Sequence, residues 1–176
     1  MGGRGSSSGM SGGGGSGRSS NNSAKSIASQ MASVTKLSSL PTLEGTSNEV
    51  DSAKQVRNRL GRELQRYALT DNGKASPEIV NKYLSGTAEE KAAFVRERAE
   101  SMTFGNESLL PEKIKSEVSN QNRFADRYTR FTEVITSNKS AKWWNGQGNT
   151  IVATKAAKDY IDGKAWNESI FGKKKK

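Results

Sequence analysis

Hydrophobic residues recur at spacings of three and four over two long stretches of this chain, which is the pattern of amphipathic helices. The first stretch runs from about Asn48 to Leu69, where Ser47 or Thr46 can cap it, and the second runs from Pro111 to about Ile135. In the first stretch the apolar stripe consists of Ala53, Val56, Leu60, Leu64 and Tyr67. In the second it consists of Ile114, Val118, Ala125, Tyr128 and Ile135, widened by Phe124 and Phe131. Each stripe is expected to pack on a shared core.

Two shorter helices are predicted between these stretches from their capping residues. Ser76-Pro77 favours a helix start, because proline in the first turn loses no hydrogen bond, and Gly86 ends that helix. Thr87-Ala88-Glu89-Glu90 forms a capping box, in which the threonine and the second glutamate each satisfy the other's backbone amide. This box predicts a helix that reaches about Met102.

The C-terminal part is compatible with two structures. The turn-rich loop 145–149 could close a hairpin between Lys142 and Thr154, or Thr150 could cap a helix that ends near Asp162. The helix is favoured because alanines and Tyr160 fall at suitable positions along it. A last turn is expected to pack onto the core through Trp166, Ile170 and Phe171.

Composition divides the chain into three parts. Half of its 18 glycines fall before Arg18, in a Gly/Ser-rich stretch with little apolar surface to offset the entropy of ordering. We therefore predict a disordered basic arm and linker over 1–46, a helical domain over 47–171 and a lysine tail over 172–176. Within the linker, 24–43 could form a short amphipathic helix on contact with a partner, or stay solvated. The predicted fold is mainly α, a compact bundle of four to six helices with a disordered Gly/Ser-rich N-terminal arm.

The positive charge is concentrated at the two ends of the chain. The net charge is +10, from 28 basic and 18 acidic residues. Eight of the basic residues lie in the arm or the tail, and they are Arg4, Arg18, Lys25, Lys36, Lys173, Lys174, Lys175 and Lys176. Basic, flexible ends attract polyanions without a shaped pocket, so nucleic acid is the first partner to consider. The alternative is a tail that only increases solubility.

Two arginine triplets and a tryptophan pair add candidate binding residues. Arginines at helical spacing on an exposed face could bind phosphates, or could pair with neighbouring acids such as Glu63 and Asp126. Of the two adjacent tryptophans, one is expected in the core and the other at least partly exposed, without the sequence deciding which. With the C-terminal lysines, the predicted nucleic-acid or partner-binding residues are Arg59, Arg62, Arg66, Arg123, Arg127, Arg130, Lys142, Trp143, Trp144, Lys173, Lys174, Lys175 and Lys176.

The composition also argues against several kinds of chemistry. The chain has no cysteine and no histidine, so thiol nucleophiles, imidazole bases and ordinary zinc sites are excluded. The carboxylates of Glu97, Glu100 and Asp126 are interpreted as members of surface ion pairs rather than as metal ligands. We expect no catalytic residue, metal, cofactor or membrane span, and hence a protein that is not an enzyme. The oligomeric state stays open.

Two short segments give the chain a resemblance to a known group. Its first nine residues, Met-Gly-Gly-Arg-Gly-Ser-Ser-Ser-Gly, resemble the leader of small prophage-encoded proteins of Gram-positive bacteria, and Ser140 to Trp144 resembles a segment near their C-terminus. In those proteins an acidic sequence that continues the helix tends to follow the second segment, whereas in this chain Asn145-Gly146 follows it. The resemblance implies phage origin, in the cytoplasm of a bacterial host or in a virion, and it carries over no functional residue.

These observations lead to two hypotheses of function. The first is a non-enzymatic phage accessory protein that binds nucleic acid or a host nucleoprotein complex and inhibits a defence system such as CRISPR-Cas. The second is a virion or head-associated structural protein that contacts nucleic acid or coat subunits.

Overall fold

The structure is a computed structural model, and it describes residues 25–31, 37, 39–71, 74–75 and 86–174. A helical segment over 25–30 is followed by α2 (Ser47–Ala68), β1 (Thr70–Asp71), β2 (Lys74–Ala75), α3 (Ala88–Ser101), η2 (Glu107–Leu109), α4 (Leu110–Thr136), α5 (Ala141–Asn145), η3 (Gln147–Asn149), α6 (Ile151–Ile161) and α7 (Glu168–Phe171). The two strands form one short antiparallel pair. The predicted mainly α fold is confirmed.

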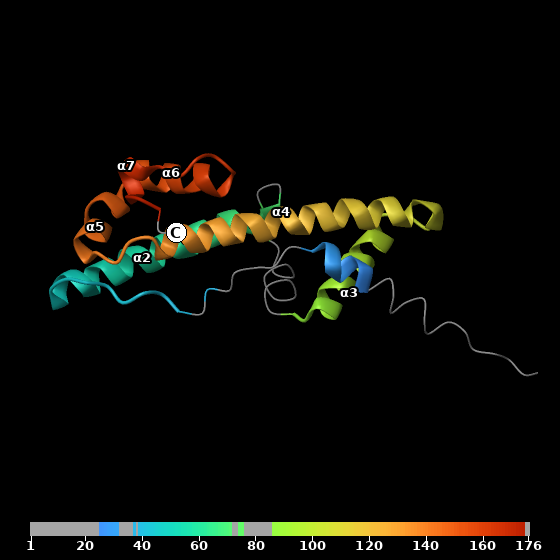
Figure 1. Ribbon diagram of the computed structural model, residues 1–176, viewed down its shortest axis with the longest axis horizontal. Coiled ribbons are helices and arrows are strands. Elements are labelled where there is room, and N and C mark those ends of the chain that lie inside the picture. The colour runs from blue at the N-terminus through green and yellow to red at the C-terminus, as the bar shows by residue number, and fades with distance from the viewer. Residues whose placement is uncertain (1–24, 32–36, 38, 72–73, 76–85, 175–176) are drawn as a thin grey trace, which may run out of the picture.

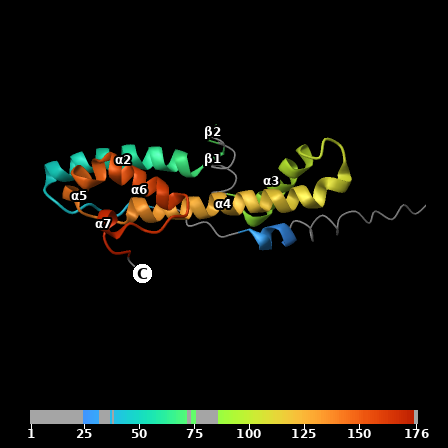
Figure 2. The same ribbon diagram turned by 90° about the horizontal axis from the view of Figure 1, so that it is seen from above.

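The longest helix, α4, connects two groups of elements (Figure 1). We call the group formed by α2, the second half of α4 and α5 to α7 the α6 end. The helical segment over 25–30, α3 and the first half of α4 form the α3 end. Figure 2 shows α5 and α6 beside α2, and α3 beside the opposite half of α4.

The helices begin where local capping predicts. Thr46 caps α2, and its backbone N–H donates to Oε2 of Glu49 at 2.9 Å, which with the Thr46 hydroxyl lowers the pKa of that carboxyl. Thr87 and Glu90 form the capping box of α3, and Pro111 lies in the first turn of α4. The helix predicted to begin at Ser76 lies outside the described residues.

The favoured structure of the C-terminal part is confirmed. The Thr150 hydroxyl accepts from the backbone N–H of Ala153 at 3.1 Å, so Thr150 caps α6 and no hairpin forms there. The helix ends at Ile161, just before Gly163 takes a φ of 103° that glycine adopts without strain. The following turn brings Ile170 and Phe171 into the core, as predicted.

The buried side chains form one large cluster and one small cluster. The large cluster fills the α6 end, extends to Phe94 of α3, and includes Leu64, Phe131 and Trp144, these three 2% exposed or less. The small cluster lies at the α3 end and consists of Ile27, Ala92, Val95 and Val118. No helix in the described part of the chain combines the length and the apolar character needed to cross a membrane.

Candidate nucleic-acid interface

The first arginine triplet lies on the exposed face of α2, as predicted. Arg59, Arg62 and Arg66 are exposed, whereas Leu60 and Leu64 between them are buried. The guanidinium of Arg59 donates to Oδ1 of Asn149, a neutral partner. Among the described residues, none forms an ion pair with any of the three arginines. Glu63 lies on the same face of α2 but pairs with Lys158 at 2.6 Å, so no ion pair with a described residue balances the three positive charges.

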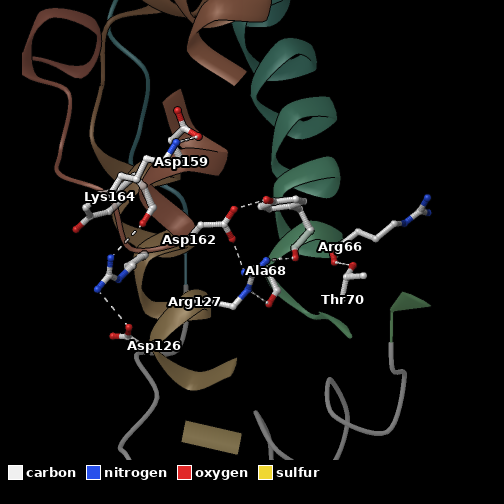
Figure 3. Close-up of polar contacts among 11 residues, drawn as sticks. Arg66, Ala68, Thr70, Asp126, Arg127, Asp159, Asp162 and Lys164 are labelled. Atoms are coloured by element: carbon white, nitrogen blue, oxygen red, sulfur yellow. Dashed lines mark hydrogen bonds and ion pairs between the residues drawn. The ribbon is translucent and has the colours of Figure 1, made fainter. Parts of the chain in front are cut away.

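The second triplet differs from the prediction, because Arg127 is not on an exposed face. Its Nε donates to the carbonyl of Ala68 at 3.1 Å, and its Nη2 donates to the carbonyl of Tyr67 at 2.8 Å. Its Nη1 also pairs with the carboxylate of Asp162, and the side chain is only 20% exposed. Figure 3 shows Arg127 between Ala68 and Asp162, with Arg66 extended away from this cluster. Arg127 thus satisfies carbonyls at the end of α2 that have no partner within the helix.

Arg130 is also occupied within the fold, whereas Arg123 is exposed. Nη1 of Arg130 donates to the carbonyl of Tyr160 at 3.2 Å, and its Nη2 lies 3.3 Å from Oδ2 of Asp126. The guanidinium of Arg123 lies 5.5 Å from the centroid of the Phe124 ring. The prediction of three aligned, exposed arginines on α4 is therefore wrong for two of them. Their carbonyl partners lie 30 to 60 residues away in the sequence, where helical periodicity gives no information. Asp126, four residues before Arg130, is one of the neighbouring acids that the sequence offered.

The tryptophan pair divides as predicted, and the structure shows which is buried. Trp144 is fully buried, and its indole N–H donates to the carbonyl of Asn138 at 2.9 Å. Trp143 is half-buried, and its N–H donates to the carbonyl of Ile170 at 3.0 Å. A Cβ at position 148 would come within 2.7 Å of the Trp143 ring, so Gly148 allows the loop to cross it. These contacts occupy much of Trp143, while Lys142 beside it is exposed.

The second lysine of the tail, Lys174, is anchored on the helical domain. Nζ of Lys174 lies 2.9 Å from Oε2 of Glu133 and 2.6 Å from the hydroxyl of Tyr160. Both contacts raise the pKa of Lys174, the hydrogen bond with Tyr160 most. Burial alone would raise the pKa of Glu133, but the hydrogen bonds from Tyr160 and Lys174 hold it below its usual range. Lys173 is exposed.

The remaining predicted basic residues of the ends lie outside the described residues, apart from Lys25, which is exposed. They are Arg4, Arg18, Lys36, Lys175 and Lys176.

The sequence analysis missed three buried polar residues. Arg57 is 6% exposed, its Nη1 donates to the carbonyl of Pro41 at 2.6 Å, and burial lowers its pKa. At the α3 end, Oε1 of the buried Glu117 accepts from Nε of Arg98 at 2.7 Å and from Nε2 of Gln121 at 2.6 Å. Arg57 and Gln121 both lie on the predicted apolar stripes, so helical spacing alone could have indicated that they are buried.

Two of the three carboxylates weighed as metal ligands, Glu100 and Asp126, are members of surface ion pairs, as expected from the sequence. Glu100 pairs with Arg96 at 2.8 Å, and Asp126 pairs with Arg130. Within the described residues no three acidic side chains are grouped as a metal site would need.

Comparison with known proteins adds no relative to these observations. No protein-family model, no curated protein and no solved structure matches this chain. The similarity of the leader to prophage-encoded proteins stays a prediction from the sequence.

Proposed function

We propose that this protein binds nucleic acid, alone or within a host nucleoprotein complex, through the arginine face of α2 formed by Arg59, Arg62 and Arg66. The observation that carries the proposal is the absence of an acidic partner for these arginines among the described residues. They extend over about 10 Å of helix, a length along which duplex DNA carries about six phosphate charges.

The basic residues of the two ends support the same function. They contribute most of the net charge of +10 and would increase the rate of encounter with any polyanion. Arginines on a rigid helix have fixed spacing, so α2 is the part suited to a defined contact. A phage accessory protein of this kind would inhibit a defence complex by occupying the surface where its guide or target strand binds.

The test is the salt dependence of binding to a labelled oligonucleotide, measured by fluorescence anisotropy. The double variant Arg62→Gln/Arg66→Gln removes two phosphate contacts, so the slope of log K against log salt should fall by about 1.8 for duplex DNA. The matched control is Lys113→Gln/Lys115→Gln, which removes the same charge from the start of α4. For the control, the slope of log K against log salt should be nearly that of the unaltered protein.

Two results would contradict the proposal. Absence of binding by the full chain at about 50 mM salt would remove nucleic acid as a direct partner. Equal losses in the double variant and its control would show that total charge, and not the arginine face of α2, determines binding.

A further inference from the structure

The strongly exposed large apolar side chains of the described residues lie in two patches. Phe104 and Leu109 lie at the turn between α3 and α4 and are 96% and 36% exposed. Ile151 and Val152 lie at the start of α6 and are 87% and 61% exposed. A lone exposed apolar residue is ordinary, but grouped ones mark sites of contact. The two patches therefore need a common explanation.

The first patch is held outward by its backbone. Phe104 has a φ of 50°, a left-handed conformation that costs a bulky residue energy, and Gly105 follows with a φ of 85°. Thr103 is buried beside it, and its hydroxyl donates to the carbonyl of Glu100 at 2.8 Å. The turn is therefore fixed on its inner side while the phenyl ring faces solvent. We call residues 97–112 the acidic tip.

The charge of the acidic tip is negative. Its one basic residue is Arg98, whose Nε is directed to the buried carboxylate of Glu117. Its carboxylates are Glu97, Glu100, Glu107 and Glu112. Glu100 pairs with Arg96 just before the tip, and the other three form no ion pair with a described residue.

The second patch occupies positions that helix stability does not explain. Ile151 and Val152 are the first two residues of α6, where branched apolar side chains gain no burial and have modest helix propensity. Acidic residues would be favoured there by the helix dipole, and this first turn has none. A contact with another molecule would explain both residues.

A groove beside this patch has a positive rim. It has a volume of about 380 Å³ and is lined by residues of α2, η3 and α6 that include Arg59, Asn149 and Ile151. Glu63 also lines it, but its carboxylate pairs with Lys158 at 2.6 Å. That volume lies within the range of about 300–1,000 Å³ of pockets for small organic ligands, so a phenyl ring fits. Lys155 is exposed and, like Arg59, forms no ion pair with a described residue. We call this the α2–α6 groove.

We propose that the acidic tip of one molecule docks into the α2–α6 groove of a second copy of this chain. Phe104 would pack against Ile151 and Val152, and the tip carboxylates would face Arg59 and Lys155. The two surfaces match in both respects, since each joins exposed apolar side chains to uncompensated charge of opposite sign. The branched aliphatic side chains of Ile151 and Val152 offer no aromatic face for base stacking, so nucleic acid fits the groove patch poorly.

The arrangement requires two molecules and does not close on itself. The acidic tip and α6 lie at opposite ends of α4, so one molecule cannot fill its own groove (Figure 2). A tip-to-groove contact is heterologous and leaves one free tip and one free groove, so further copies can add in line. This assembly does not require nucleic acid, although Arg59 belongs to both proposed surfaces, and it would align Arg62 and Arg66 of successive copies.

The experiment uses two full-length variants, each lacking one surface. Phe104→Asp removes the apolar contact of the acidic tip, and aspartate tolerates the left-handed backbone at this position. Ile151→Asp/Val152→Asp removes the groove patch and places acids where the dipole of α6 favours them. Sedimentation velocity at concentrations up to about 1 mM should show species larger than dimers for the wild type, since interfaces of this size are weak.

Mixing the variants gives the decisive measurement. Each variant alone should remain monomeric, because it keeps only one surface. An equimolar mixture should form a 1:1 dimer and nothing larger, since one variant supplies the groove and the other supplies the tip. The charge reversal Arg59→Glu in the groove partner should weaken that dimer at least about tenfold, and Glu107→Arg in the tip partner should restore part of the affinity.

Three results would overturn the proposal. They are a wild type that stays monomeric throughout, variants that assemble like the wild type, and a mixture that stays monomeric although both variants melt cooperatively.

Discussion

The two ends of this molecule share α4 but are held together by different forces. At the α6 end, large apolar side chains such as Trp144 and Phe131 are fully buried among helices. At the α3 end, Phe94 reaches the large cluster, but the separate small cluster has only four buried residues and lies next to a buried glutamate, Glu117. Hydrophobic stabilisation scales with apolar area removed from water, so one continuous helix joins a strongly and a weakly stabilised region. Helix length by itself therefore says little about local stability.

The polar cluster at the α3 end adds to this difference. Glu117 pairs with Arg98, but its Oε2 and the Oε1 of Gln121 have no hydrogen-bond partner among the described residues. A buried charge is costly to desolvate, and its pairing often does no more than offset that cost. We therefore expect the α3 end to open locally at a lower free energy than global unfolding requires.

Removing the largest side chain of the α6 end should have the largest effect. Trp144→Ala deletes a fully buried ring and the hydrogen bond to Asn138, so the free energy of unfolding should fall by about 3–5 kcal/mol. Urea denaturation followed by circular dichroism measures this value. Val134→Ala at the α6 end and Val95→Ala at the α3 end delete the same two methyl groups from buried sites, and a larger loss at Val95 would reverse the proposed order of the two ends.

Removing the buried carboxylate should affect the α3 end alone. Glu117→Ala leaves Arg98 and Gln121 without their shared acceptor, which should lower the opening free energy of α3 by about 1–3 kcal/mol. Hydrogen exchange read by mass spectrometry would show faster exchange in α3 and unchanged exchange in α2. Uniformly faster exchange along the chain would mean that the two ends unfold as one unit.

The smallest effect is expected at the anchored lysine. Because the pKa of Glu133 is lowered by folding, its stabilising contribution is complete above the pKa of the unfolded state and is lost as pH falls through the folded pKa. Acidification should therefore release Lys174, and Glu133→Gln should do so at neutral pH, at a cost below about 1 kcal/mol. Tryptic cleavage after Lys173 and Lys174 should become faster.

Glu112→Gln, which removes a carboxylate far from the lysine tail, is the control for that measurement. If it accelerates cleavage as much as Glu133→Gln does, the anchoring contact has no effect on the tail.

Local signals in the sequence predicted much of the fold. Thr46, Thr87 and Thr150 each cap a helix through contacts within three residues, so the starts of α2, α3 and α6 could be predicted. The surface of α4 could not, because Arg127 and Arg130 bind carbonyls at the ends of α2 and α6.

The distinction between the two tryptophans needed tertiary contacts in the same way. Trp144 donates to Asn138, and the close approach of Gly148 covers part of Trp143. The burial of two polar residues of α4 could have been predicted from the hydrophobic pattern alone. Gln121 and Thr132 occupy the gaps in the apolar stripe of α4, and both are buried.

The anchoring of both basic ends on α4 has a consequence for avidity. The segment over 25–30 is held by Ile27 against Val118, and Lys174 is held at Glu133, which places the two anchors about 22 Å apart along the helix. A polyanion shorter than this, below about six base pairs of duplex, would engage one end at a time. With a longer polyanion, the second end would also bind, at a high effective concentration. Affinity should therefore rise steeply with ligand length near that threshold and slowly beyond it.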